Sequence, residues 1–294
     1  MSSIVIPAHD EAGAIDQLLT SLAPLGDDTE IVVVCNGCTD DTAARARAVA
    51  PWAQVVELDE ASKPAALDAG DATATSFPRA YIDADVLIDA PAARALLDGV
   101  RDGAEAVGAT PVHDVSASSA AVRAHYAIWS RMPANIEGIA GTNAMAVSAE
   151  GRARFDSWPR FIGDDYFLDG QFSPAEKRRI PDAVISHPAP RGLRDCVSRK
   201  ARIYQGNVDV LEHGLRPPHT GGGLRGALTV IRDQPRLAVC LPAHLFVTVA
   251  AKLLVRWRQR RGTAQVWYRD RARDGSGDGA QLAGAREGGS SSAR

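Results

Sequence analysis

Short β-branched runs alternate with longer helical patterns over the first hundred residues, and this alternation restricts the possible folds more than any other feature. Strands are predicted at residues 4–6, 31–34, 55–58, 80–82 and 104–108. Helices are predicted at residues 12–22, 42–49, 65–72 and 92–100, the first two with N-terminal signals in Asp10-Glu11 and Thr39-Asp40-Asp41. This succession is typical of βαβ units and predicts an α/β fold, in which helices flank a mainly parallel sheet.

The second half of the chain is less regular. Helices are predicted at 116–131 and 193–211, strands at 144–147 and 183–187, and a short helix from Asp165. Three regions are predicted: an α/β domain over residues 1–215, a C-terminal helical segment over 216–273 and a disordered tail over 274–294. The boundary follows from a Pro- and Gly-rich stretch at 216–223, and the tail from its Gly, Ser and Ala content.

The composition excludes several classes of protein. A hydrophobic share of 45% with 23% charged residues indicates a globular core rather than disorder. The mean hydropathy of -0.14 argues against a polytopic membrane protein, and the net charge of -3 argues against a nucleic-acid partner. The first residues lack the basic start and the long apolar run of a secretion signal, so we expect a cytoplasmic protein.

Two of the four cysteines, Cys35 and Cys38, form a C-x-x-C motif between an apolar run and a helical pattern. A thioredoxin-type redox pair occupies such a place, so a thiol oxidoreductase is one alternative function. Cys196 and Cys240 stand alone, and four cysteines in 294 residues do not indicate a disulfide scaffold.

Polar residues follow several predicted strands. Residues 7–11 follow the first strand, residues 35–41 follow the second, and Asp83 and Asp85 directly follow the fourth. Parallel strands end at one edge of a sheet, where ligands bind, so these residues are expected to gather there. Two carboxylates two residues apart suit Mg²⁺ or Mn²⁺. The alternative is an ordinary polar surface loop.

A second acidic pair, Asp164 and Asp165, stands at the start of a predicted helix. A partly desolvated carboxylate beside another acid can act as a general base, although helix starts also favour carboxylates that have no catalytic role. Lys63, which follows the third strand, could reach a phosphate or pair with Asp59 or Glu60.

Two arginines, Arg199 and Arg202, lie on the helix predicted at 193–211. A guanidinium group can hold a diphosphate through two parallel hydrogen bonds, so these residues are candidate diphosphate ligands. A solvated helix face is the alternative.

Taken in order, these motifs resemble those of the inverting family 2 glycosyltransferases of the GT-A fold. Residues 5–11 (VIPAHDE) resemble the family's opening V-I-P-A-x-N-E, and residues 33–42 (VVCNGCTDDT) resemble V-V-D-x-G-S-T-D-x-T. Residues 63–70 (KPAALDAG) are similar to G-K-x-x-A-L-N-x-G. Residues 83–85 stand where the family has its metal-binding D-x-D, residues 141–145 (GTNAM) near its acceptor-side G-x-N-x-x, and residues 163–165 where it has its E-D base motif. The resemblance covers about residues 3–210.

The resemblance implies transfer of a sugar, with inversion, from a nucleoside diphosphate sugar to a hydroxyl acceptor in glycan, glycolipid or glycosylated-metabolite biosynthesis. It implies the following roles: Asp165, beside Asp164, as the base; Asp85 with Asp83 as ligands of Mg²⁺ or Mn²⁺; and Pro7, Ala8, Glu11, Asn36, Lys63 and Asp83 around the donor nucleotide. A non-catalytic nucleotide-sugar-binding protein of the same fold is a further alternative.

Three departures from the family pattern affect these expectations. Asn36 replaces the aspartate that meets the nucleotide base, which leaves uracil, thymine and guanine open. Residues 199–203 (RKARI) stand where processive synthases carry Q-x-x-R-W, which argues against a processive polymer synthase. Cys38 replaces a common serine, so the C-x-x-C motif can be a by-product of the nucleotide loop.

A strongly apolar stretch at 237–255 has nearly the length that crosses a bilayer, but Pro242, His244 and Lys252 are costly in hydrocarbon. We therefore expect a buried or interfacial helix. Basic and aromatic residues follow it: Arg256, Trp257, Arg258, Arg260, Arg261, Trp267, Tyr268, Arg269, Arg271 and Arg273. This pattern suits anionic lipid headgroups and predicts a peripheral enzyme at the inner face of the cell membrane, acting on a lipid-linked acceptor. A solvated basic tail is the alternative.

Overall fold

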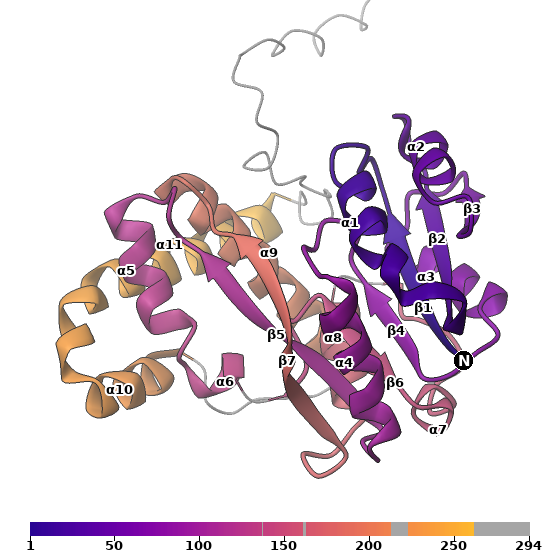
Figure 1. The fold of residues 1–294 in the computed structure, drawn as a ribbon. Helices are drawn as coiled ribbons and strands as arrows, with labels where there is room; N and C mark the ends of the chain where they lie inside the picture. The colour runs from indigo at the N-terminus through magenta and orange to yellow at the C-terminus, as the bar shows by residue number, and fades with distance from the viewer. Residues whose placement is uncertain (137, 161–162, 213–222, 262–294) are drawn as a thin grey trace, which may run out of the picture.

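A seven-stranded sheet runs through the molecule in the order β3-β2-β1-β4-β6-β5-β7 (Figure 1). The computed structural model describes residues 1–136, 138–160, 163–212 and 223–261. The strands are β1 (Ser2–Ala8), β2 (Thr29–Asn36), β3 (Gln54–Leu58), β4 (Arg79–Ile82), β5 (Ala106–Asp114), β6 (Ala144–Val147) and β7 (Lys177–Pro188). The predicted α/β fold, with helices flanking a mainly parallel sheet, is confirmed.

The helices of the described residues match most of the predicted helical patterns. They are α1 (Ile15–Leu22), α2 (Thr42–Val49), α3 (Lys63–Thr73), α4 (Ala90–Arg101), α5 (Ala120–Trp129), α6 (Pro133–Ile136), α7 (Ala149–Arg152), α8 (Asp164–Gly170), α9 (Leu193–Glu212), α10 (Gly223–Asp233) and α11 (Leu241–Arg260). Two 3-10 helices, η1 (Ala23–Asp28) and η2 (Pro235–Cys240), precede β2 and α11. Most of the linker predicted at 216–223 lies outside the described residues, as do Trp267, Tyr268 and the tail predicted at 274–294.

Strand direction brings the polar loops to one edge of the sheet. Among the described strands only β6 is antiparallel to its neighbours, β4 and β5. The carboxyl ends of β1, β2, β4, β5 and β7 therefore lie at the same edge as the amino end of β6. Ile82, the last residue of β4, pairs with Ala144, the first of β6, so the residues beside them, Asp83 and Asn143, are neighbours.

The two faces of the sheet bury alternate residues of the same strands. On β1, Ile4 packs with Leu18 of α1 and Leu97 of α4, whereas Val5 packs with Leu67 of α3 on the opposite face. Each large apolar side chain that is fully buried in this way contributes about 1.5–3 kcal/mol relative to exposure. The core thus holds the sheet between α1 and α4 on one side and α3 on the other (Figure 1).

The predicted ends of three strands are wrong, because polar or Pro residues lie in the strands. β5 runs from Ala106 to Asp114 and not over 104–108, since it pairs with β7 as far as Asp114. β1 begins at Ser2, two residues before the predicted start, and Ser3 is buried because its hydroxyl donates to the Ser76 carbonyl at 2.6 Å. β7 begins at Lys177, well before the predicted residue 183, because Lys177 pairs with buried Asp169 and Arg179 donates to the Gly138 carbonyl at 2.7 Å. Tertiary partners therefore allow these charged and hydroxyl side chains to lie in a sheet.

The C-terminal helices form a layer beyond β5 and β7, where α11 packs against α5 and α9 (Figure 1). Val247 of α11 shares an apolar cluster with Val122 of α5, and Ala251 shares one with Ala201 of α9. The single helix predicted over 237–255 is divided, because residues 235–240 form η2 and Pro242 stands in the first turn of α11. One face of α11 is buried, in agreement with the expectation of a buried or interfacial helix.

Candidate functional site

A lysine joins the two acidic pairs of the chain. Lys63 stands in the first turn of α3, and its Nζ lies 2.7 Å from Oδ1 of Asp83 and 2.9 Å from Oδ2 of Asp164. The two carboxylates raise the pKa of the Lys63 ammonium even though burial lowers it. The predicted alternative, a pairing with Asp59 or Glu60, is wrong because the start of α3 faces the edge of the sheet instead. The bridge brings residues from both halves of the chain into one site.

Asp83 is also held by the strand entering from the other side. Asn143 Nδ2 donates to Asp83 Oδ2 at 2.8 Å, and the Asp83 backbone N–H donates to the Asn143 carbonyl at 3.0 Å. Burial raises the pKa of Asp83, but the Lys63 charge and these hydrogen bonds outweigh burial and lower it. Asp83 is therefore an ionised carboxylate in a fixed orientation.

Asp165 lies beside this bridge at the start of α8. Its two carboxylate oxygens accept backbone N–H bonds from Gly141 at 2.7 Å and from Tyr166 at 2.9 Å. Burial and the neighbouring charge of Asp164 raise the pKa of Asp165 to about 6. The arrangement gives a carboxyl group whose pKa is close to the working range of a general base.

Asp85 and His187 lie on the same edge of the sheet. Asp85 is half-buried in the turn after β4, and His187, near the end of β7, is 5% exposed. Within the described part of the chain the buried Nε2 of His187 has no hydrogen-bond partner. Burial lowers the pKa of His187 to about 4 against the opposing charge of Asp83. Sequence reasoning missed His187, although its place at the end of a predicted strand could have indicated it.

The residues predicted around the nucleotide lie at the ends of β1 and β2. Pro7 and Ala8 are buried, and Asn36, 3% exposed, donates from Nδ2 to the Ala8 carbonyl at 2.8 Å. Glu11 is half-buried, and its backbone N–H donates to the Thr42 hydroxyl at 2.8 Å. The Asn36 amide thus ties the first two strands together where they leave the sheet.

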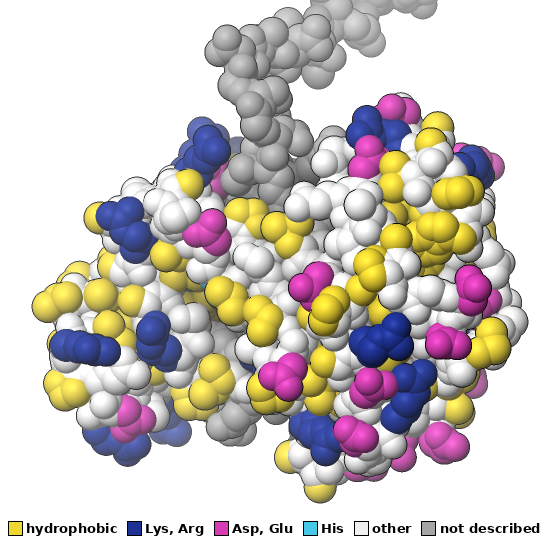
Figure 2. All heavy atoms as spheres, in the orientation of Figure 1, with side chains coloured by type: hydrophobic (Ala, Val, Ile, Leu, Met, Phe, Trp, Pro, Cys, Tyr) yellow, Lys and Arg dark blue, Asp and Glu magenta, His cyan; other side chains and the backbone are white. Residues whose placement is uncertain are grey.

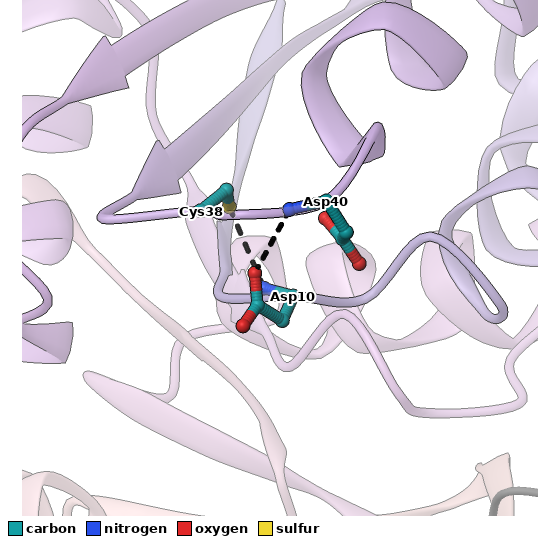
Figure 3. A group of neighbouring side chains, drawn as sticks. All are labelled: Asp10, Cys38 and Asp40. Atoms are coloured by element: carbon teal, nitrogen blue, oxygen red, sulfur yellow. Dashed lines mark hydrogen bonds between the residues drawn. The ribbon is translucent and has the colours of Figure 1, made fainter.

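Asp10 and Asp40 link the loops that follow β1 and β2 (Figure 3). Asp10 has a φ of 53° and accepts the backbone N–H groups of Thr39 at 2.6 Å and Asp40 at 3.3 Å. Asp40 accepts the N–H of Ala12 at 3.2 Å. These acids were predicted as N-terminal signals of the first two helices, but neither helix has a side-chain cap on its N-cap residue. Their hydrogen bonds fix the two loops relative to each other.

The C-x-x-C motif has the wrong electrostatics for thiol redox chemistry. Cys35 is buried, and burial raises the pKa of its thiol to about 12. Burial also raises the pKa of Cys38. A reactive cysteine requires a lowered pKa, so the thiol oxidoreductase alternative is disfavoured.

The two arginines predicted as diphosphate ligands lie in different surroundings. Arg199 donates to the Pro188 carbonyl at 3.1 Å, and its charge contributes to the lowered pKa of His187. Arg202 is exposed, one turn further along α9. The structure therefore brings Arg199 close to the acidic edge of the sheet and leaves Arg202 on the surface.

The first half of the chain matches a known family. Residues 3–148, which run from β1 to the end of β6, match the model of glycosyl transferase family 2. The chain carries a family 2 glycosyltransferase domain. Four of the motifs that indicated the family, at residues 63–70, 83–85, 141–145 and 163–165, meet around Lys63. No curated protein matches the sequence.

Solved glycosyltransferase structures share the fold of this glycosyltransferase. Glucosyl-3-phosphoglycerate synthase from Mycobacterium tuberculosis, solved with Mn²⁺, UDP-glucose and phosphoglyceric acid, is 21% identical, with a TM-score of 0.54 over 76% of this chain and 83% of that one. A mannosyltransferase from Pyrobaculum calidifontis, solved with GDP-Man and Mn²⁺, is 22% identical, with a TM-score of 0.53 over 90% of this chain and 83% of that one. These likenesses show the GT-A fold.

Proposed function

We propose that this glycosyltransferase moves a sugar from a nucleoside diphosphate donor to a hydroxyl acceptor with inversion, and that it is non-processive. The observation that carries the proposal is the Lys63 bridge, which gathers Asp83 and Asp164 within 3 Å of one ammonium group and places Asp165 beside them. Two acidic pairs with separate chemical tasks fit a single displacement at the anomeric carbon, with a metal on the leaving side and a base on the acceptor side.

We assign Mg²⁺ or Mn²⁺ to the leaving side by ligand type. Asp83, Asp85 and His187 would have to move closer together to share one ion, because the ligand atoms that lie within 4.8 Å of one another in the described residues are those of Asp10, Cys38 and Asp40. Asp85 and Asp83 supply hard carboxylate oxygens, and His187 supplies a buried ring nitrogen whose Nε2 is not hydrogen bonded within the described residues. When bound, the ion neutralises charge on the departing nucleoside diphosphate. Neighbours of the same fold were solved with Mn²⁺ or Mg²⁺ together with a nucleotide, which supports this assignment.

We assign the base role to Asp165 rather than Asp164. Asp164 is engaged by the Lys63 ammonium, whereas Asp165 is oriented by two backbone N–H groups and has a pKa raised to about 6. Asp165 would take the proton from the acceptor hydroxyl as it attacks. Asp164 acts through Lys63, which it helps to hold in place.

The donor nucleotide is assigned to the loops after β1 and β2. Pro7, Ala8, Glu11 and Asn36 line their start, and Lys63 reaches the same edge from α3. Because Asn36 already donates to the Ala8 carbonyl, its remaining amide hydrogen and its oxygen are the groups left for a base. Arg199 is the nearer diphosphate candidate, and Arg202 has a role only if α9 shifts toward the sheet edge.

A thermal-shift panel tests this function. UDP, GDP, dTDP and CMP are each added with and without Mn²⁺ to the wild type, to Asp85→Ala and to the control Asp102→Ala, whose carboxylate is exposed at the end of α4. A nucleotide at about a hundred times its Kd stabilises the folded state by about 2.7 kcal/mol. We expect a Mn²⁺-dependent shift for one nucleotide that Asp85→Ala abolishes and Asp102→Ala retains. The absence of a shift with any nucleotide would contradict the proposal.

A peripheral contact with anionic membrane is the second part of the proposal. Residues 235–260 are long and apolar enough to cross a membrane by length and composition, and 28% of the most apolar window is buried. The buried side of α11 packs on α5 and α9, which favours a helix lying on a membrane over one crossing it. The outward side of α11 carries a stripe of large apolar residues, each about half exposed: Phe246, Val249, Leu253 and Trp257.

Charge around this stripe is strongly one-sided. Residues 223–261 contain a single acid, Asp233, and eight basic residues: Arg225, Arg232, Arg236, Lys252, Arg256, Arg258, Arg260 and Arg261. The whole chain, in contrast, has a net charge of -3. Figure 2 shows basic and apolar side chains interleaved over the part of the molecule where α5 and α10 lie. Such a surface suits anionic headgroups, and it supports a cytoplasmic enzyme at the inner membrane face with a lipid-linked acceptor.

We accordingly propose residues 1–215 as the glycosyl-transfer domain and residues 216–273 as its membrane-contacting segment. Co-sedimentation with anionic vesicles tests the contact. Trp257→Ser should reduce the bound fraction, whereas Trp52→Ser, which removes an equally exposed tryptophan from the opposite end of the chain, should not. Equal binding by both variants, or binding that is insensitive to salt, would contradict this surface.

A further inference from the structure

A buried lysine without a carboxylate partner lies in the C-terminal helical layer. Lys200 of α9 is 9% exposed, and its Nζ lies 4.8 Å from the ring centre of Trp129 and 5.3 Å from that of Tyr204. Within the described ranges no carboxylate pairs with it, and the titratable groups that act on it are Cys196 and Lys252. An ammonium group has three donors, and its burial without acceptors is costly.

The groups around Lys200 supply no negative charge. His125 and His244 stack with ring centres 4.9 Å apart, and neither Nδ1 has a hydrogen-bond partner among the described residues. Burial, with the charge of Lys200, lowers the pKa of His125 to about 2 and of His244 to about 4. Lys252 lies over the same Tyr204 ring at 5.6 Å. The cluster thus holds four basic groups.

A small open pocket leads to this cluster. Lys200 lines it together with Arg199, His125, Tyr126, Trp129 and Cys196. A methionine would fill the volume of the lysine stem without any electrostatic penalty, and apolar replacements of buried charges are often neutral or stabilising. A buried ammonium in the wall of a small, half-open pocket, with a guanidinium group in the same wall, is the arrangement that an anion at the pocket mouth would complete.

We propose that this pocket binds a phosphate-type oxyanion, with Lys200 as the residue that pairs with it. Lys200 is separated from the donor site, because the rings of Trp129, His113 and His187 stand in succession between Lys200 and Asp83, with centres 5.1 Å and 6.0 Å apart. Arg199 lines the pocket and also acts on His187 at the donor edge, so the residue specific to the pocket is Lys200. The proposal goes beyond the proposed glycosyl transfer and does not depend on it. A phosphate on a lipid and a soluble phosphate ester have the chemistry that the pocket requires.

Protonation of Lys200 gives the site a pH signature. Burial and the charge of Lys252 lower the pKa of Lys200 to about 7. A bound oxyanion favours the ammonium form, so anion affinity should fall as the pH rises through about 7. The groups that face Lys200 do not compete in this range, because the imidazoles of His125 and His244 are neutral above pH 5 and burial raises the pKa of Cys196 to about 11.

Sulfate binding to the full chain at constant ionic strength tests the site, because sulfate stays a dianion from pH 6 to 9. Titration calorimetry should show binding that weakens above pH 7. Lys200→Met should weaken it at least tenfold, whereas Arg101→Gln, an exposed basic residue at the end of α4, should leave it unchanged. Three results would each overturn the proposal: undetectable sulfate binding by the wild type, equal sulfate binding by Lys200→Met, or a sulfate affinity that does not depend on pH. If Lys200→Met does not fold, Lys200→Gln replaces it.

Two further ligands distinguish the sources of the anion. Glycerol 3-phosphate represents a soluble ester, and vesicles containing phosphatidic acid represent a lipid headgroup. Loss of only glycerol 3-phosphate binding in Lys200→Met assigns a soluble ester, and weaker vesicle binding assigns a lipid phosphate. If neither changes, the pocket does not bind phosphate. Nucleotide binding with Mn²⁺, which Lys200→Met should retain, is scored separately, so the failure of one proposal is not confused with that of the other.

Discussion

Asp165 owes its proposed chemistry to two opposing influences on one carboxyl group. Backbone N–H groups of Gly141 and Tyr166 favour its ionised form, while burial and the charge of Asp164 favour the protonated form and win, raising the pKa to about 6. A base must be deprotonated to work, so glycosyl transfer should rise with pH up to about 6 and then level off. Measurement of nucleotide release from pH 4.5 to 8 checks this.

The Asp165→Asn variant tests directly whether Asp165 is the general base. The amide cannot accept the proton, and loss of a general base typically costs about 10²–10⁴-fold in rate. Nucleotide binding should persist, since the metal ligands are untouched. Asp182→Asn, an exposed position on β7, is the control. A variant that retained full turnover would move the base to another residue.

Asp71 is a buried carboxylate that stabilises the fold by accepting hydrogen bonds from four side chains. Its Oδ1 accepts from Arg79 at 2.7 Å and from the Tyr81 hydroxyl at 2.7 Å, and its Oδ2 accepts from Arg152 at 2.7 Å and from Trp158 Nε1 at 2.8 Å. Removing one partner of a buried ion pair typically costs about 3–5 kcal/mol, so Asp71→Ala should lose that much unfolding free energy in urea. Asp98→Ala, which breaks the exposed pair with Arg101, should lose at most about 1 kcal/mol.

At the scale of elements, the contact between α3 and β1 depends on a glycine. A Cβ at Gly70 would lie 2.2 Å from Cγ1 of Val5, which is fully buried. Gly70→Ala should therefore destabilise the fold by about 1–3 kcal/mol through overpacking. Overpacking would push α3 away from β1, and because α3 also carries Lys63, this movement would disturb the acidic site. Unfolding in urea gives the magnitude.

A second substitution separates overpacking from helix effects. Val5→Ala makes room for the new methyl group, so the double variant with Gly70→Ala should be more stable than the sum of the single changes predicts. Gly13→Ala, where a Cβ would meet no atom within 4 Å, should be nearly neutral. Additive losses in the double variant would show that the contact is not the cause.

Elements also show what the sequence could and could not predict. The apolar runs and turn signals located α2 and β6 to the residue and indicated all seven strands. The pattern is clearest for β1, β4 and β6, whose residues are buried on both faces of the sheet. The antiparallel direction of β6 was not predictable, since direction depends on tertiary pairing. Likewise the family motifs indicated Asp83 and Asp165, but the Lys63 partners and the proximity of His187 depend on contacts between distant segments.

At the scale of the whole molecule, the C-terminal helices stabilise the fold in addition to forming the proposed membrane-contacting surface. The inner side of α11, including Val247 and Ala251, covers Val122 of α5 and Ala201 of α9. A chain ending after residue 215 lacks α11 and would expose the apolar residues of α5 and α9 that α11 covers. We therefore predict a lower Tm than that of the full chain, and aggregation at concentrations where the full chain is soluble. A chain ending after residue 261 retains every described element and is the control. Equal Tm values would mean that the first domain is independent.

The Lys63 bridge also affects how the protein folds when no metal ion is bound. The Lys63 ammonium group neutralises the buried carboxylates of Asp83 and Asp164 without any divalent ion. The protein can therefore fold without a metal ion, whereas some small metal-binding domains are unfolded when the metal is removed. Treatment with EDTA should leave the melting curve of the nucleotide-free protein unchanged. If Asp83 and Asp85 hold the ion only when nucleotide is bound, the supply of metal in the cell would limit the rate of glycosyl transfer without changing the amount of folded protein.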